Sequence, residues 1–311
     1  MSRTLLALCC LCFCGGVSAS AQQEAEVSKL KARIQTLEAE NQRLRDRLSK
    51  IAALAARPTT TARGLSIVVA TDDWGGAQKA DVLKVLQSAS QPLWLSSGKP
   101  SLRQLDVSND RRGPMAVYRR APDENYRVLV NVNGRRWAQL SFQFAHEFSH
   151  VLSNYRNVPN RQMWFEESIC ECASLYSLRR MGETWKTNPP YSNWASYAGS
   201  LSKYANDRIA ATKPVQGDDL AKWYADNKKT LDATSTNREL NLVVACRLLK
   251  IFEKSPGSWS AVRKLNMGDP RENQSLETYL AGWHSRVDVK NRKMVAEIAK
   301  LFGISVHASA K

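Results

Sequence analysis

Residues 137–154 read WAQLSFQFAHEFSHVLSN, and their apolar side chains recur every three or four positions. That spacing is typical of a helix with one buried face. Within it, residues 146–150 form the pattern HExxH. Positions four apart lie little more than one helical turn apart, so His146 and His150 project from one face and can share a metal ion. Glu147 projects beside them and can accept a proton from a water at that metal.

A second segment, residues 163–171, reads MWFEESICE. Here the chain resembles the gluzincins, zinc metallopeptidases that hold their metal with two histidines and a glutamate. Their second metal helix carries a W-x-x-E pattern, and the resemblance implies that Glu167 is the third ligand. Sixteen residues separate it from His150. Glu166, about a quarter turn away, is the competing ligand.

Helical geometry adds one more carboxylate to this group. At about 100° per residue, Glu167 and Glu171 lie on the same helix face. Glu171 is therefore placed to accept a hydrogen bond from the far ring nitrogen of His146 or His150, as metal-bound histidines usually require. Two histidines and one glutamate leave a fourth position open, which is typical of catalytic zinc. The sequence thus predicts one Zn²⁺ per chain.

Short apolar runs precede the metal-binding pattern, and only helical periodicity follows it, which predicts the α+β class. The order of elements resembles a minimal zincin (thermolysin-like) catalytic domain, with a small mixed sheet and active-site helices. We expect that domain over residues 65–230 and a helical C-terminal subdomain over 231–311. The expected elements before the metal helix are strands at 65–70, 115–118 and 126–132 and a helix at 77–88.

Two further expectations come from this resemblance. In the family, the strand before the metal helix is the sheet edge that pairs with the substrate main chain. An oxyanion donor, often Tyr, His or Arg, completes the site; no motif selects among Tyr191, Tyr197 and Tyr204. His284 is expected to be solvent-exposed and outside the site. The substrate-binding candidates on the expected edge, which runs to Asn133, are Val128, Leu129, Val130, Asn131 and Val132.

Together these residues predict a zinc-dependent metallopeptidase that hydrolyses peptide bonds with Glu147 as general base. One alternative is a coiled-coil envelope scaffold that carries a non-catalytic peptidase-like domain. Another is a polymer-binding protein in which the metal is incidental. The intact HExxH pattern and Glu167 argue against a non-catalytic domain, because such a domain has no need of the general base.

The first 21 residues have the features of a signal peptide. Arg3 gives a positive start, an apolar stretch runs to Cys14, and residues 19–21 are the small residues that signal peptidase needs. The apolar stretch is shorter than the ~20 residues of a membrane-spanning helix. We therefore expect an exported protein, periplasmic or secreted. Lipid attachment at Cys9 or Cys14 is disfavoured because each follows a bulky residue.

The chain is strongly basic, with a formal charge of +16. Such a protein is attracted to anionic surfaces, such as membranes or envelope polymers. Its arginine pairs are scattered, without the basic run interleaved with aromatics that would indicate a nucleic-acid site. Beyond the signal peptide only Cys170, Cys172 and Cys246 remain, so at most one internal disulfide can form.

Residues 22–57 have the heptad periodicity of a coiled coil, and Pro58 begins a linker over residues 58–64. Three charge pairs between flanking positions are attractive in a parallel arrangement. Asn41 is the lone polar a residue, which favours two strands. A single amphipathic helix folded back on the catalytic domain is the alternative. The a and d positions are Val27, Leu30, Ile34, Leu37, Asn41, Leu44, Leu48 and Ile51.

We expect the mature protein to be a parallel homodimer through residues 24–55. A protein that begins at Thr61 should be monomeric yet active, because the predicted catalytic residues all lie beyond residue 140. Asn41→Ile should stabilise the coil and loosen its preference for two strands. Light scattering decides the matter: a monomeric mature chain would indicate the folded-back helix, and a dimer without residues 24–55 would place the interface elsewhere.

Overall fold

The computed structural model describes residues 25–45, 64–120, 122–268 and 273–306. The chain divides into two units, Met1–Ala62 and Arg63–Lys311. The signal peptide predicted over residues 1–21 and all of the predicted linker except Gly64 lie outside the described residues.

In the first unit, residues 25–45 form one continuous helix whose side chains are all exposed. The apolar heptad positions within this range, Val27, Leu30, Ile34, Leu37 and Leu44, have exposed fractions from 44% to 63%. An apolar row along an exposed helix is what a coiled-coil partner would cover. The helix agrees with the expected secondary structure, and the two-stranded coil stays a prediction.

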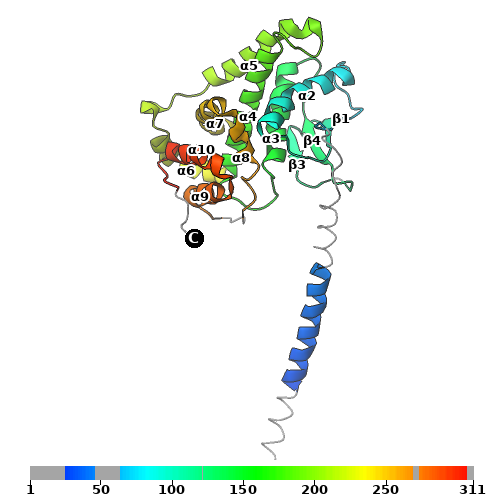
Figure 1. Ribbon diagram of the computed structural model, residues 1–311, viewed down its shortest axis with the longest axis vertical. Helices are drawn as coiled ribbons and strands as arrows, with labels where there is room; N and C mark the ends of the chain where they lie inside the picture. The colour runs from blue at the N-terminus through cyan, green and yellow to red at the C-terminus, as the bar shows by residue number, and fades with distance from the viewer. Residues whose placement is uncertain (1–24, 46–63, 121, 269–272, 307–311) are drawn as a thin grey trace, which may run out of the picture. The chain divides into compact units, whose positions relative to one another are not determined.

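A four-stranded mixed sheet forms one side of the second unit, with the order β1-β2-β4-β3 (Figure 1). β1, β2 and β4 run parallel, and β3 runs antiparallel to β4. The small mixed sheet and the helices that follow it confirm the mixed class that the sequence predicts. The strands are β1 (Ile67–Val69), β2 (Leu105–Asn109), β3 (Met115–Val117) and β4 (Tyr126–Val130).

The sheet corrects one expectation about the substrate edge. β4 is not an edge strand, because Val128 pairs with Val107 of β2 on one side and with Ala116 of β3 on the other. Just beyond β4, the main-chain N–H and C=O of Asn131 bond the amide of Gln143, at 2.8 Å and 3.0 Å. The edge role expected for Val128, Leu129, Val130, Asn131 and Val132 is therefore wrong, and β3 is the edge.

Helices make up the rest of the second unit, and α2 runs further than the sequence predicts. It continues through Pro92 to Ser96, since Leu93 is fully buried and anchors the last turn. No described helix is long and apolar enough to cross a membrane. The helices are α2 (Lys79–Ser96), α3 (Trp137–Leu152), α4 (Met163–Thr184), α5 (Ala198–Ala210), α6 (Leu220–Ala233), α7 (Arg238–Lys254), α8 (Trp259–Val262), α9 (Leu276–Arg286) and α10 (Val289–Leu301), with 3₁₀ turns at Ser192–Tyr197, Gln216–Asp218 and Pro256–Ser258.

Helix α4 is the central element of this unit. It is buried on nearly all its faces and packs against α2, α3, α5 and α7. A helix surrounded in this way needs apolar or fully paired side chains on every face. Its contact with α3 is the most extensive between any two described elements. The two helices with the predicted metal-binding residues are therefore held together by the core itself.

Aromatic packing ties the C-terminal helices to α4. The ring of Phe165 lies 6.0 Å from each of the rings of Tyr279 and Trp283 on α9 and of Phe302 after α10. Phe165 and Trp283 are fully buried. Edge-to-face contacts of this kind add to the free energy of burying the rings. The first turn of α4 thus packs against residues more than a hundred positions away in the sequence.

We expect Phe165→Ala to lower the free energy of unfolding by about 3–5 kcal/mol, because it opens a cavity between α4, α9 and α10. Denaturant unfolding followed by tryptophan fluorescence measures the loss. Met267→Ala is the matched control, since Met267 is 54% exposed and its truncation should cost less than ~0.5 kcal/mol. Equal midpoints for the two variants would contradict the packing described for Phe165.

Candidate metal centre

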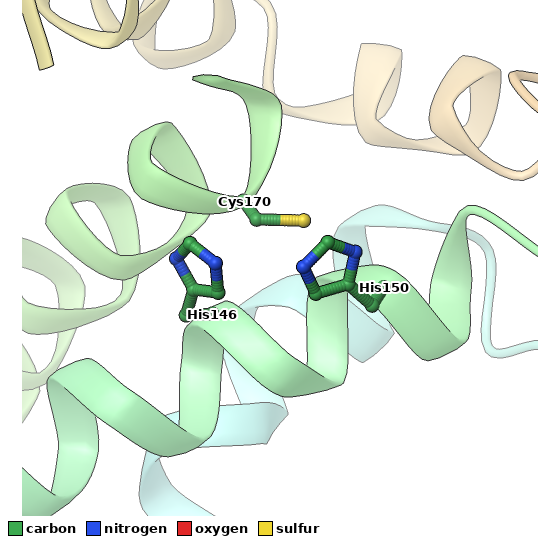
Figure 2. A group of neighbouring side chains, drawn as sticks. All are labelled: His146, His150 and Cys170. Atoms are coloured by element: carbon green, nitrogen blue, oxygen red, sulfur yellow. The ribbon is translucent and has the colours of Figure 1, made fainter. Parts of the chain in front are cut away.

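His146 and His150 project from one face of α3 toward α4, as Figure 2 shows. Their ring centroids lie 5.2 Å apart. The helix ends just beyond them, where Asn154 takes a left-handed conformation with φ of 56°. Asparagine tolerates that conformation better than most residues. The turn lets the N–H of Tyr155 bond the carbonyl of His150 at 3.1 Å.

Glu167 of α4 faces both imidazoles. One carboxylate oxygen lies 3.1 Å from Nε2 of His146, and the other lies 3.6 Å from Nε2 of His150. Three ligand groups of the kinds that hold catalytic zinc therefore converge on one point. The structure brings together the residues that the sequence predicts as ligands.

Each imidazole directs its other nitrogen to a different carboxylate. Nδ1 of His150 lies 2.8 Å from Oε1 of Glu166, and Nδ1 of His146 lies 3.5 Å from Oε2 of Glu171. Such carboxylates fix the tautomer and orientation of a metal-binding histidine. Glu171 therefore lies where helical geometry predicts it. Glu166, considered from the sequence only as a rival ligand, occupies the equivalent position behind His150.

Glu166 is held by a buried polar network. Its Oε1 accepts from Oγ of Ser153 at 3.0 Å, and its Oε2 accepts from Nδ2 of Asn266 at 2.7 Å. Asn266 in turn accepts from the hydroxyl of Tyr279 at 3.2 Å. These bonds satisfy a carboxylate that would otherwise be costly to bury. No sequence pattern marks Asn266, because it lies a hundred positions after Glu166 and outside any helix.

Glu147 is buried and lines the same cavity as the two histidines. Among the described residues, no side chain forms a hydrogen bond or an ion pair with it. Its carboxylate therefore has free acceptor capacity in the cavity that His146, His150 and Glu167 also line. That is the arrangement which a general base requires.

Electrostatics in this cluster favour a bound cation. Burial alone would lower the pKa of His146, but its hydrogen bonds to Glu167 and Glu171 outweigh burial and raise that pKa well above its usual range. The pKa of His150 is raised in the same way, against burial, chiefly by Glu166. Protons on the imidazoles offset the surrounding carboxylates in a metal-free protein. A divalent cation at the Nε2 atoms would replace those protons, and the donor set fits zinc.

Cys170 is a second candidate for the third ligand. Its thiol and one nitrogen from each histidine lie within 4.8 Å of one another. Burial, followed by the charges of Glu166 and Glu167, raises the pKa of this thiol well above its usual range. Cys170 is fully buried and is absent from the cavity lining, whereas Glu167 belongs to it. These observations favour Glu167 as the ligand; all three described cysteines are free.

The cluster opens into a cavity of about 290 Å³ between β3, α3, α4, α5 and the start of α7. A larger hollow of about 700 Å³ lies elsewhere in the unit, beside α2 and the end of α4. The lining of that hollow includes no histidine, cysteine or carboxylate among the described residues. The site chemistry therefore belongs to the smaller cavity.

The structure separates the tyrosines that the sequence could not rank. Tyr204 lines the cavity, whereas the hydroxyl of Tyr197 bonds the N–H of Ala138 at 3.3 Å and Tyr191 stacks on a tryptophan outside the site. Two tyrosines that sequence reasoning missed, Tyr118 and Tyr155, also line it. Their positions follow from the end of β3 and the turn after α3.

His284 corrects a further expectation. It is buried in α9 rather than exposed, because α9 packs this face against α10 and the aromatic cluster. It is not among the residues that line the cavity. The expectation that it lies outside the site therefore agrees with the structure, and the expected exposure is wrong.

No protein-family model, curated protein or solved structure matches this chain.

We expect about one zinc per chain in the purified protein, measured by plasma mass spectrometry. His146→Ala, His150→Ala and Glu167→Ala should each abolish binding, since each removes a converging ligand. Glu166→Ala should retain the metal with ~10–100-fold weaker affinity, because it disorients His150 without removing a ligand. Cys170→Ser is the matched control and should bind as the wild type. Loss of zinc in Cys170→Ser with retention in Glu167→Ala would exchange the two roles.

Proposed function

We propose that the protein is an exported zinc metallopeptidase, with zinc held by His146, His150 and Glu167. The observation that carries the proposal is the convergence of these three side chains beside the unpaired carboxylate of Glu147. A structural zinc site has no use for such a carboxylate, since its ligands fill all four positions. One cavity would then hold the metal ion, the general base and the groups that contact the substrate.

The chemistry assigned to the chain is general acid–base catalysis. A Zn²⁺ ion bound at the convergence point would supply a Lewis acid that polarises a peptide carbonyl and acidifies water. Glu147 accepts the proton of the attacking water and passes it to the leaving amine. Glu166 and Glu171 hold the two imidazoles in orientation throughout. The contacts observed for Glu147, Glu166 and Glu171 are compatible with the roles proposed for them.

The substrate main chain is proposed to pair with β3. Pro114, Met115 and Ala116 line the cavity, and β3 is the last strand in the sheet order. An exposed strand edge binds peptides of mixed sequence through main-chain hydrogen bonds. The C-terminal end of β3 is held in place, because the main-chain carbonyl of Val117 accepts a hydrogen bond from the hydroxyl of Tyr155 at 2.7 Å.

Tyr118 is the proposed donor to the developing oxyanion, because the neighbouring Tyr155 already donates its hydroxyl hydrogen to the carbonyl of Val117. Their rings lie 5.2 Å apart at the end of β3. Burial, more than any nearby charge, raises the pKa of Tyr118 and that of Tyr155 to about 12. Both hydroxyls therefore stay protonated at neutral pH, and that of Tyr118 can donate a hydrogen bond to a negatively charged oxygen. Tyr204 is the remaining alternative.

We expect Glu147→Gln to keep its zinc but to lose peptide hydrolysis by about 100- to 10,000-fold, because an amide cannot accept the water's proton. A peptide mixture digested by the zinc-loaded protein and analysed by mass spectrometry measures the loss. Glu183→Gln is the matched control, since Glu183 is exposed and pairs with Arg180 outside the cavity. Unchanged turnover in Glu147→Gln would end the proposed mechanism.

A further inference from the structure

Two arginines line the cavity together with the metal centre, and neither is required to hold the metal. Arg208 comes from α5 and Arg238 from the first turn of α7. Arginine presents five N–H donors in a planar fork that matches a carboxylate. A cavity with two such groups beside its reactive centre is built to receive negative charge.

Arg208 is held in place from two sides. Its guanidinium carbon lies 4.0 Å from the centre of the Phe142 ring and 5.5 Å from that of Tyr204. One guanidinium nitrogen lies 3.8 Å from Oε1 of Glu171. That separation is too long for a good hydrogen bond, so most donors of the fork remain available. Stacking fixes the plane of the fork without using its N–H groups.

Arg238 has fewer contacts. Among the described residues, no carboxylate oxygen lies within 4.0 Å of it. It nevertheless lines the same cavity as His146, His150 and Glu167, so its charge acts on the same space. An exposed guanidinium at the cavity wall can turn toward a bound ligand without breaking an ion pair.

The balance of charge opposes the alternative that the cavity receives an amine. Glu147, Glu167 and Glu171 line it, and a divalent cation with two guanidinium groups outweighs these three carboxylates by one positive charge. Glu166 does not line the cavity, and its carboxylate is directed into the interior, where it bonds His150, Ser153 and Asn266. An incoming carboxylate therefore meets a net attraction, and an ammonium group meets repulsion.

We infer that Arg208 and Arg238 form a carboxylate subsite, so that the protein prefers peptides with a negative group close to the cleaved bond. This inference rests on the proposed peptidase function. A carboxylate can come from an aspartate or glutamate side chain or from the free C-terminus of the peptide. Both sources present the same planar group to the guanidinium fork.

The test begins with a cleaved sequence, identified from a digest of mixed peptides by the zinc-loaded mature protein. That sequence is then prepared with Glu, Gln or Lys at each position next to the cut, and with a free or an amidated C-terminus. We expect kcat/KM to favour Glu over Gln at one flank, or the free acid over the amide, by ~10-fold or more, as for a hydrogen bond to a charged group. The preference should shrink at high salt.

Substitutions of the two arginines test whether they cause the preference for a negatively charged group. Arg208→Gln and Arg238→Gln should each reduce it severalfold, whereas Arg238→Lys should retain most of it because the charge remains. Arg238→Glu should turn the preference toward Lys. Arg263→Gln is the matched control, since Arg263 is exposed and does not line the cavity. Cleavage without any preference, or a preference that survives both glutamine variants, would overturn the subsite.

A binding measurement keeps the subsite separable from the peptidase proposal. Zinc-loaded Glu147→Gln protein is titrated by calorimetry with acetyl-Ala-Ala-Glu-Ala-Ala-amide, with its Gln counterpart and with acetyl-pentaalanine that has a free carboxylate. Tighter binding of either acidic peptide, lost in Arg238→Gln, supports the subsite even if the wild type cleaves nothing, an outcome that would refute only the peptidase proposal. Equal dissociation constants for all three peptides would refute the subsite.

Discussion

Burial of carboxylates beside two imidazoles between α3 and α4 is the constraint on which the rest of the unit depends. Glu147, Glu166 and Glu171 are the only fully buried carboxylates among the described residues. An unpaired buried charge costs several kcal/mol, so each must be matched by donors or by a cation. The elements around α4 supply those partners. The packing of α4 and the chemistry of the cavity therefore depend on the same residues.

Neighbouring residues of α4 divide this work because successive side chains point about 100° apart. Glu166 points into the interior, toward Ser153 and Asn266, and Glu167 points into the cavity. The interior partner comes from the segment between α8 and α9. The segment between α8 and α9 thus contributes to the orientation of His150 without lining the cavity. That segment belongs to the same compact unit as the sheet, which is consistent with its contact with Glu166.

The parts of this arrangement that could be predicted from the sequence are those governed by spacing within one helix. A period of 3.6 residues places His146 with His150 and Glu167 with Glu171 on one helix face, whereas the role of Glu167 as third ligand comes from the resemblance to the gluzincins. β2 could not be found, because Asp106 and Ser108 leave it only a short apolar signal. A strand at β3 is expected, but its place at the end of the sheet depends on how the strands pair. The partner of Glu166 lies a hundred positions away, and neither pairing leaves a local pattern.

Stability alone does not explain why Glu147 is retained. The other two buried carboxylates have partners that account for their burial: an imidazole and two uncharged donors for Glu166, and an imidazole and a guanidinium for Glu171. Glu147 has no such partner among the described residues, although it lies beside the same imidazoles. A fold that gives each neighbouring carboxylate a charged or hydrogen-bonded partner would gain stability from an uncharged residue at position 147. An unsatisfied carboxylate that faces a cavity is what the proposed general base requires, because it is free to accept the proton of a water.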